Sequence, residues 1–242
     1  MTARSPHGPV VAGVDDSPAA LRAVSFAGEE ARMRGLPLHL LHAVRWPFDD
    51  PASCERHVPE LVRVAAEELL RSAVAAAPGQ PEGGVTTTLT HGDPVAVLRA
   101  ASADASVVVV GRRGTGGVPG LLLGSTSAGL AARADCPVIV VPDDAAAVVR
   151  GRRSVVVGVE GRGRDDEVLA FAFTEAAARG TDVLAVLAWQ DADLETAYPS
   201  LGPPADRPGA HPDGERLLSE ALAGWREKEP DVVVREAVVR DR

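Results

Sequence analysis

One stretch of this chain places a strand, a glycine turn and a helix start in succession, and it limits the folds open to the sequence. Four consecutive valines, Val107–Val110, are typical of a strand that is buried on both faces. Gly111 follows at once, where a strand must turn sharply and where a ligand can approach the backbone. Further along, Gly124 precedes an alanine-rich segment, 125–134, that we expect to be helical. This succession predicts an α/β fold.

The same stretch has the layout of a phosphate-binding loop. A helix start offers N–H groups without partners and a partial positive charge, and both attract an anion. The loop lacks the lysine of the G-x-x-x-x-G-K-[ST] motif, and its spacing differs from G-x-G-x-x-G. Its own spacing, from Gly111 through Gly114 to Gly124 and Ser125, is G-x2-G-x9-G-S. We favour nucleotide binding over a purely structural loop.

Alternating strands and helices extend over the first part of the chain. We expect strands over residues 10–14, 38–44, 85–90, 107–110 and 138–141, and helices over 18–34, 59–77, 94–101 and 125–134. Ser17 is expected to cap the first helix and Gly35 to end it. Strands separated by helices form a parallel sheet that is covered on both faces, with ligands beyond the carboxyl ends of its strands. The pattern therefore predicts an open, doubly wound, Rossmann-like domain of five strands.

The chain also repeats itself at a constant offset of 145 residues. The matching pairs are Val10–Asp15 with Val155–Glu160, Phe26-Ala27 with Phe171-Ala172, and Arg34-Gly35 with Arg179-Gly180. Matches at one offset predict tandem copies of one domain-sized unit. We expect a first unit over residues 1–142, a connector over 143–153 and a second unit over 154–242.

The second unit is expected to be incomplete. Its predicted strands cover residues 155–159, 183–187 and 232–239, and its predicted helices cover 165–179 and 215–228. The glycine loop, the last helices and the last two strands of the first copy have no counterpart, and Glu160 stands where Asp15 would be. A truncated chain and a degenerate second copy both explain this pattern. We therefore predict no binding residues in the second unit.

Composition excludes several classes of partner. The net charge of −9 argues against a surface that binds nucleic acid. No stretch approaches the ~20 apolar residues that a membrane span needs, and residues 1–9 lack the long apolar run of a signal peptide. The two cysteines, Cys54 and Cys136, suggest neither a disulfide framework nor a metal cluster. We expect a cytoplasmic protein without nucleic-acid or membrane partners.

The glycine spacing and several neighbouring segments resemble the universal stress protein family, in its ATP-binding subgroup. The segments that carry the resemblance, besides the glycine loop, are Val14-Asp15, 41–44 (LHAV), 91–94 (HGDP) and 135–141 (DCPVIVV). The resemblance covers the whole first copy and the first three strands of the second. It implies the strand order 3-2-1-4-5 and a role in the cytoplasmic stress response. It also implies a homodimer, or pairing of the two repeats with each other.

The resemblance further implies which residues hold ATP, with or without Mg²⁺. The ends of the first two strands would meet the nucleoside and its adenine, and the glycine loop with the following helix start would meet the phosphates and ribose. The expected nucleotide-binding residues are Gly13, Val14, Asp15, Ala43, Val110, Gly111, Arg112, Gly114, Gly124, Ser125 and Thr126. Because the carboxyl ends of parallel strands meet at one edge of a sheet, these positions are expected to lie together.

Several of these residues have a structural role open to them as well. Asp15 can accept hydrogen bonds from sugar hydroxyls or help to cap the helix that follows it. Ser125 can bond a phosphate or cap its own helix, and we favour the phosphate. Arg112 and Arg113 can pair with phosphate oxygens, whereas loop arginines are more often solvated. We expect His42 to be a hydrogen-bonded core or rim histidine.

We expect a regulatory nucleotide switch with an unidentified protein partner. No Ser–His–Asp order, carboxylate pair or nucleophile elbow stands out, so any ATP hydrolysis should be slow. One alternative is an enzyme of the adenylyl-transferring or ATP-pyrophosphatase class, which needs a catalytic lysine or a Ser-Gly-Gly loop after the first strand. Asp16-Ser17-Pro18 stands there, and the only lysine is Lys228. A nucleotide-free interaction module of the same fold is the other alternative. The sequence leaves ATP, ADP, AMP and cyclic nucleotides open.

Overall fold

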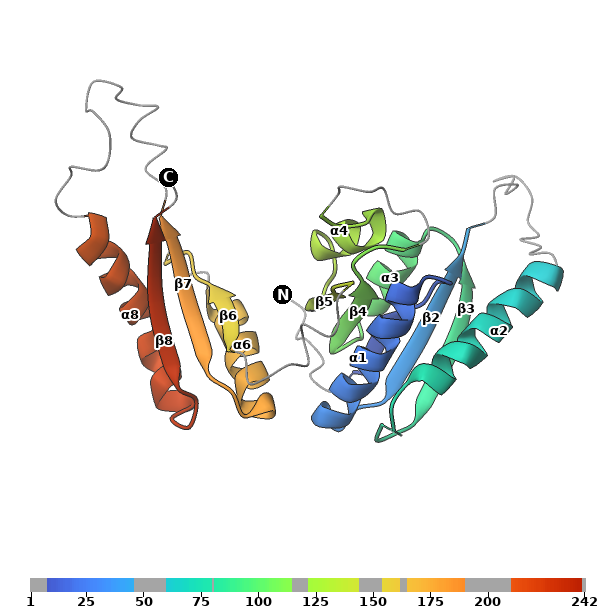
Figure 1. The fold of residues 1–242 in the computed structure, drawn as a ribbon, viewed down its shortest axis with the longest axis horizontal. Coiled ribbons are helices and arrows are strands. Elements are labelled where there is room, and N and C mark those ends of the chain that lie inside the picture. Colours follow the sequence, from blue (N-terminus) through green and yellow to red (C-terminus); the bar gives the residue numbers. More distant parts are fainter. Residues whose placement is uncertain are drawn as a thin grey trace, which may run out of the picture. The chain divides into compact units, whose positions relative to one another are not determined.

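A computed structural model describes residues 8–45, 60–79, 81–114, 122–143, 154–161, 165–189 and 210–240. The chain divides into two compact units, Met1–Arg150 and Gly151–Arg242, and each has its own sheet (Figure 1). The division falls within the connector expected over 143–153. Residues 1–7, 115–121 of the glycine loop and 144–153 of the connector lie outside the described residues, as do Cys54 and the start of the second predicted helix, Pro59.

The first unit contains a five-stranded parallel sheet in the order β3-β2-β1-β4-β5, which confirms the predicted fold class. Its strands are β1 (Val10–Gly13), β2 (Leu38–Val44), β3 (Val85–His91), β4 (Val107–Gly111) and β5 (Val138–Val141). Its helices are α1 (Pro18–Arg34), α2 (Glu60–Ala76), α3 (Pro94–Ser102) and α4 (Ser125–Ala131). In the register, Val10 lies between Leu38 and Val107. Strand β1 therefore occupies the centre of the sheet.

The central strands are buried on both faces, as the valine run predicts. Val107, Val108 and Val109 are 0% exposed and Val110 is 4% exposed. Alternate residues of β1 and β4 belong to two different hydrophobic clusters. One cluster contains residues of α1 and α2, and the other contains Leu98 of α3 and Leu130 of α4. Figure 1 shows these helices against the sheet. Because all five strands are parallel, their carboxyl ends lie at one edge of the sheet.

Helix α1 begins and ends at the predicted residues. The Ser17 hydroxyl accepts a hydrogen bond from the Ala20 N–H at 3.1 Å and so caps the helix. Gly35 has a φ of 63°, a left-handed conformation that favours glycine and ends the helix. Helix α4 ends at Ala131 instead of residue 134, and the Arg133 N–H bonds only three residues back, to the Leu130 carbonyl, in the turn that closes the helix.

The second unit has a parallel three-stranded sheet in the order β6-β7-β8. Its strands are β6 (Val155–Gly158), β7 (Val183–Trp189) and β8 (Val234–Arg240), and its helices are α6 (Asp166–Arg179) and α8 (Ala210–Lys228). Helix α8 begins five residues before the predicted start at 215. The order repeats that of β1, β2 and β3 in the first unit, which is consistent with a tandem repeat. Phe173 is fully buried and stacks on Trp225 with ring centroids 5.6 Å apart.

The last turns of α1 and α6 carry the same ion pair. Arg34 pairs with the buried Glu30, and Arg179 pairs with the buried Glu175 four residues before it. Gly180 then ends α6 with a φ of 59°, as Gly35 ends α1. The likeness of the two copies therefore extends to a polar interaction inside each unit. Across the described residues, no helix is long and apolar enough to cross a membrane.

Candidate functional site

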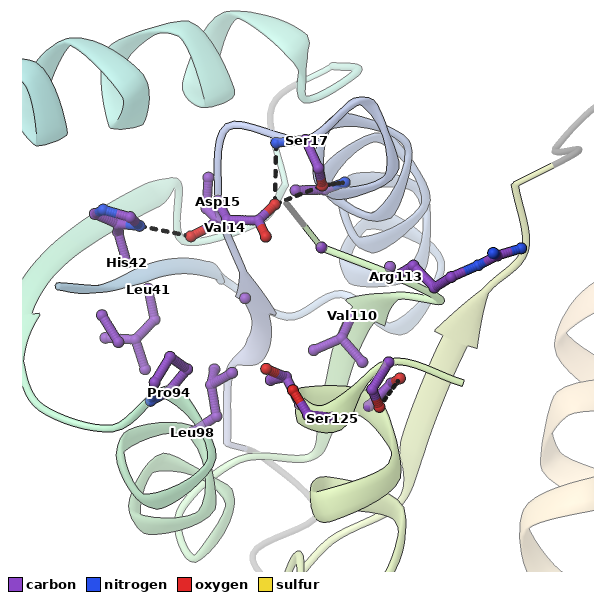
Figure 2. Close-up of a pocket in the computed structure, with 18 of the residues that line it drawn as sticks. Val14, Asp15, Ser17, Leu41, His42, Pro94, Leu98, Val110, Arg113 and Ser125 are labelled. Carbon is purple, nitrogen blue, oxygen red and sulfur yellow. Dashed lines mark hydrogen bonds between the residues drawn. The ribbon is translucent and has the colours of Figure 1, made fainter. Parts of the chain in front are cut away.

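A cleft of about 580 Å³ lies at the carboxyl edge of the five-stranded sheet (Figure 2). Strands β1, β2 and β4 end there, and the beginnings of α3 and α4 close its sides. Its lining residues are Gly13, Val14, Asp15, Asp16, Ser17, Ala20, Leu41, His42, Ala43, Arg45, Pro94, Leu98, Val110, Gly111, Arg113, Gly114, Gly124, Ser125, Thr126 and Ser127. The strand order reverses direction between β1 and β4, and doubly wound sheets bind ligands at this point. The volume falls within the ~300–1,000 Å³ of small-molecule sites.

The cleft brings together ten of the eleven residues that the sequence and the family resemblance predict for nucleotide binding. They are Gly13, Val14, Asp15, Ala43, Val110, Gly111, Gly114, Gly124, Ser125 and Thr126. Arg112 is the exception. Its side chain donates to the Asp143 carboxylate beyond β5, with its Nε 3.1 Å from Oδ2. Its neighbour Arg113 lines the cleft instead.

Asp15 connects the end of β1 with the glycine loop. Its Oδ1 accepts hydrogen bonds from the Ser17 N–H at 3.1 Å and from the Ser17 hydroxyl. Asp15 thus orients the residue that caps α1. Its Oδ2 lies so close to Gly114 that a Cβ on this glycine would be 2.2 Å from it. A side chain at Gly114 would displace the carboxylate, so glycine permits the close approach of the two segments.

Gly111 serves packing as well as the cleft. A Cβ on Gly111 would lie 2.9 Å from the backbone carbonyl of Ala19. This contact is between β4 and the first turn of α1, so the glycine allows the helix to lie directly on the strand. The position of Gly111 after the valine strand predicts a sharp turn and the approach of a ligand. The structure adds the approach of a helix backbone as a separate reason.

The start of α4 is held against the end of β4 by hydrogen bonds to one carbonyl. The carbonyl oxygen of Arg112 accepts from the Gly124 N–H at 2.9 Å and from the Ser127 hydroxyl at 2.9 Å. Ser127 is buried, and its hydroxyl oxygen also lies 3.0 Å from the Gly124 carbonyl oxygen, so the two carbonyls share its one hydrogen. Ser125 and Thr126, between these anchors, line the cleft. The first N–H groups of a helix have no partner within it, so this turn can offer donors to a ligand.

The opposite side of the cleft is formed by the ends of β1 and β2. The His42 Nδ1 lies 2.7 Å from the carbonyl oxygen of Val14. A carbonyl only accepts, so Nδ1 carries the hydrogen and donates it. Figure 2 shows this bond joining the two strand ends beside Leu41. The hydrogen-bonded rim histidine predicted from the sequence is confirmed.

An ion pair borders the cleft next to His42. Arg45 lies one residue beyond β2 and pairs with Asp93, which caps α3 by accepting from Val95 and Ala96. The Ala96 N–H, together with the Arg45 guanidinium, holds the pKa of Asp93 below its ordinary value. Sequence reasoning missed Arg45 at the cleft, because nothing in the pattern fixes the direction of an arginine after a strand. The described residues contain no group of three or more His, Cys, Asp or Glu side chains that could hold a metal ion.

Several of the cleft residues that the sequence reasoning missed come from helices. Leu98 and Pro94 of α3 and Ser127 of α4 line it. An available signal is their position in the first two turns of helices that follow strands, because these turns lie at the carboxyl edge of a parallel sheet. The geometry gives a cleft with an apolar floor, a carboxylate, hydroxyls and an open backbone loop.

Comparison with known proteins agrees with this architecture. The model of the universal stress protein family matches residues 7–142. Universal stress protein Rv2623 of Mycobacterium tuberculosis is 35% identical, covering 96% of this chain and 79% of that protein. Universal stress protein Rv1996 of the same organism is 32% identical, covering 100% of this chain and 82% of that protein.

A solved structure agrees at the level of the fold. The crystal structure of a universal stress protein from Archaeoglobus fulgidus has a TM-score of 0.66 at 18% identity. It covers 97% of this chain, and the match takes in 79% of that protein. The family match over the first unit and the identity to relatives over nearly the whole chain lead to one conclusion: this chain belongs to the universal stress protein family.

Proposed function

We propose that the first unit binds ATP and works as a nucleotide-dependent regulatory switch in a cytoplasmic stress response. One observation carries the proposal: a single cleft at the sheet's switch point joins the glycine loop to the ends of β1 and β2. The loop side offers backbone and hydroxyl groups from Gly114, Gly124 and Ser125. The strand side offers a carboxylate and apolar surface. A nucleotide needs both kinds of surface at once.

The described residues suggest how each part of ATP would be held. Phosphates would meet the backbone at the start of α4 and the hydroxyls of Ser125 and Thr126, which line the cleft. Gly114 lies beside them, where it leaves room for the Asp15 carboxylate. The Asp15 carboxylate can accept hydrogen bonds from ribose hydroxyls. The adenine would lie toward Ala43 at the end of β2. Leu41, Leu98 and Val110 supply apolar surface in the same cleft.

Mg²⁺ would enter this site with the nucleotide. The ion is usually bound through one or two carboxylates together with the phosphates of a substrate. Asp15 and Asp16 are the carboxylate side chains among the described lining residues, and Asp15 borders the glycine loop. They fit an ion that is held mainly by phosphates. The ion would neutralise charge between the phosphates and Asp15.

The proposed role is regulation, not chemistry. A ligand shifts an equilibrium only when it binds the two states with different affinity. We expect ATP to change association of the protein with a second copy, pairing of its two repeats or binding to a protein partner. An enzyme of the adenylyl-transferring or ATP-pyrophosphatase class would instead turn ATP over at on the order of 1 per second or faster.

The first test is to identify the bound nucleotide and measure its affinity. Mass spectrometry of nucleotide released from the denatured protein distinguishes ATP, ADP, AMP and cyclic nucleotides. Calorimetry then compares the wild type with Gly124→Val, where the new side chain would occupy the space at the helix start. A Cβ there would lie 3.3 Å from the Arg112 carbonyl oxygen, so thermal unfolding must show that the variant remains folded.

The control is Gly158→Val in the second unit, where a Cβ meets nothing within 4 Å. We expect Gly124→Val to weaken ATP binding by at least tenfold, about 1.4 kcal/mol, and Gly158→Val to leave it unchanged. Equal affinity in a folded Gly124→Val variant would contradict the site. Absence of any nucleotide binding would favour the interaction module, and rapid multiple turnover would favour the enzyme.

A further inference from the structure

Three arginines surround one carboxylate next to the cleft. Arg22 of α1, Arg112 and Arg113 all pair with Asp143, two residues beyond β5. The terminal nitrogen of Arg113 is 3.2 Å from Oδ2, and that of Arg22 is 3.6 Å from Oδ1. Among the described residues, Asp143 is the one acidic side chain that pairs with these arginines. The cluster therefore carries two positive charges more than negative ones.

The pairings in this cluster are open to exchange. The side chains of Arg112 and Arg113 are 29% and 27% exposed, and that of Asp143 is 38% exposed. Ion pairs in contact with solvent contribute only about 0–1 kcal/mol, so a stronger anion can replace the carboxylate. The Nε of Arg22 is buried and has no hydrogen-bond partner in the structure. The cluster thus has donor capacity that Asp143 does not use.

Asp143 remains an anion under ordinary conditions. The hydrogen bond from Arg112 and the charges of all three arginines hold the pKa of Asp143 below its ordinary value. The carboxylate is therefore ionised at neutral pH. It can compete with any other anion for the same guanidinium groups.

Arg113 belongs to both the cluster and the cleft. It lines the cleft next to Gly114, while its guanidinium pairs with Asp143. Figure 2 shows its side chain extending away from Val110 and Ser125. The backbone beside it is fixed, because Arg112 donates to the Val141 carbonyl and accepts from Gly124 and Ser127. The side chain is then the part of Arg113 that can turn toward a ligand.

We propose that Arg113 selects nucleotides with a polyphosphate chain, and that Asp143 competes with the phosphates for it. The adenosine part of this inference rests on the proposed function. When a polyphosphate enters, Arg113 exchanges the Asp143 carboxylate for phosphate oxygens, which a guanidinium can bind through two parallel N–H bonds. Arg22 and Arg112 keep Asp143 paired, so the exchange leaves no carboxylate without a cation. Adenosine has no phosphate, and AMP lacks the β- and γ-phosphates that would draw Arg113 away.

The test uses calorimetry on the full chain with three probes: ATP, AMP and inorganic tripolyphosphate. Arg113→Gln should weaken ATP and tripolyphosphate binding roughly tenfold and leave AMP binding within about twofold. Arg113→Lys should recover part of the loss, because it keeps the charge without the planar fork. Asp143→Asn should strengthen ATP and tripolyphosphate binding severalfold and leave AMP binding unchanged.

The matched control is Asp104→Asn, which makes the same charge change in the exposed turn before β4, at the other end of that strand. It should change none of the three affinities by more than about twofold. Thermal unfolding of every variant excludes loss of fold as the cause. Arg113→Lys also keeps the test valid if Arg113→Gln does not fold.

The outcomes separate this inference from the proposed function. If ATP and AMP bind and their affinity ratio is the same in all variants, the inference is wrong and the ATP site stands. If tripolyphosphate binding changes as expected in the variants but ATP binds no more tightly than tripolyphosphate, the anion site stands and the proposed function is wrong. If the wild type binds neither ATP nor tripolyphosphate, both are wrong.

Discussion

Strands β1 and β6 have nearly the same sequence, but they occupy different surroundings. Val11 of β1 is 2% exposed, whereas Val156 at the same position of β6 is 64% exposed. Strand β1 pairs with β2 on one side and β4 on the other. Strand β6 pairs with β7, and it is an edge of the described three-stranded sheet. The short apolar run therefore specifies a strand in both units, but not how deeply that strand is buried.

The glycines at the ends of these strands show the same difference at atomic scale. A Cβ on Gly13 would lie 3.0 Å from Leu98 of α3 and 3.1 Å from Val110 of β4. A Cβ on Gly158 would meet no atom within 4 Å. The first unit thus places α3 and β4 where the described second unit has open space. Those two elements also form part of the cleft, so the two units differ at the binding site as well as in packing.

The largest expected effect tests whether each unit has its own stability. Phe173→Ala removes a fully buried ring that stacks on Trp225, and such truncations in a core cost about 3–5 kcal/mol. Hydrogen exchange resolved by peptide should show lower protection in β6, β7 and β8 and unchanged protection in β1–β5. Loss of protection in both sheets would contradict independent stability, because it would mean that the two units unfold together.

A somewhat smaller effect is expected from ATP, under the proposed function. At a free concentration of 100 times Kd, a ligand that binds only the native state stabilises it by about 2.7 kcal/mol. The same hydrogen-exchange measurement should show this gain in the first unit and none in the second. AMP at the same multiple of its own Kd is the control, because it occupies the site to the same degree as ATP. Protection gained in β6–β8 would mean that the second unit takes part in binding or in its response.

The paired glycines provide the next prediction. Gly13→Ala should cost about 1–3 kcal/mol, because the new methyl group overpacks against Leu98 and Val110. Gly158→Ala should be neutral or stabilise the second unit by about 0.4–1 kcal/mol, through a less flexible unfolded chain. Urea unfolding, followed separately for each unit, measures the change in the free energy of unfolding that each variant causes. Similar costs at the two positions would show that β6 is covered in solution.

The smallest expected effect is at Val156. Val156→Thr should change the free energy of unfolding by less than about 0.5 kcal/mol, as do most exposed substitutions. Val11→Thr is the matched variant, and it should cost about 1–3 kcal/mol because it buries a hydroxyl. A cost above about 1 kcal/mol at Val156 would indicate a partner on this face.

The sequence predicted the sheet and most of the cleft because both depend on local signals. The valine run of β4, the caps of α1 and the glycine spacing are all local, and parallel topology alone gathers the strand ends. The direction of the Arg112 side chain could not be predicted in this way. It depends on Asp143, which is 31 residues away in sequence and reaches it only through the pairing of β4 with β5.

The other misses have the same origin. Leu98 reaches the cleft through the packing of α3 on the sheet, and Ser127 reaches it through a hydrogen bond to Arg112 across the glycine loop. The early end of α4 reflects where the next segment must go, since the Asp135 N–H bonds to the Ser102 hydroxyl of α3. Tertiary contacts of this kind leave little trace in the local pattern.

The pairs Glu30–Arg34 and Glu175–Arg179 each join a buried glutamate to a partly exposed arginine, which affects how the two copies can diverge. The glutamates are buried, whereas the arginine side chains are 18% and 27% exposed. Loss of the arginine would leave a buried carboxylate without a cation, at a cost that approaches the ~3–5 kcal/mol of a broken buried pair, whereas replacing both residues with apolar ones is often neutral. A single substitution that removes one partner of either pair is therefore expected to lower the free energy of unfolding. Losing either pair without a stability cost takes two substitutions, and the intermediate with one substitution is destabilised. This favours retention of both pairs while the surrounding sequence changes.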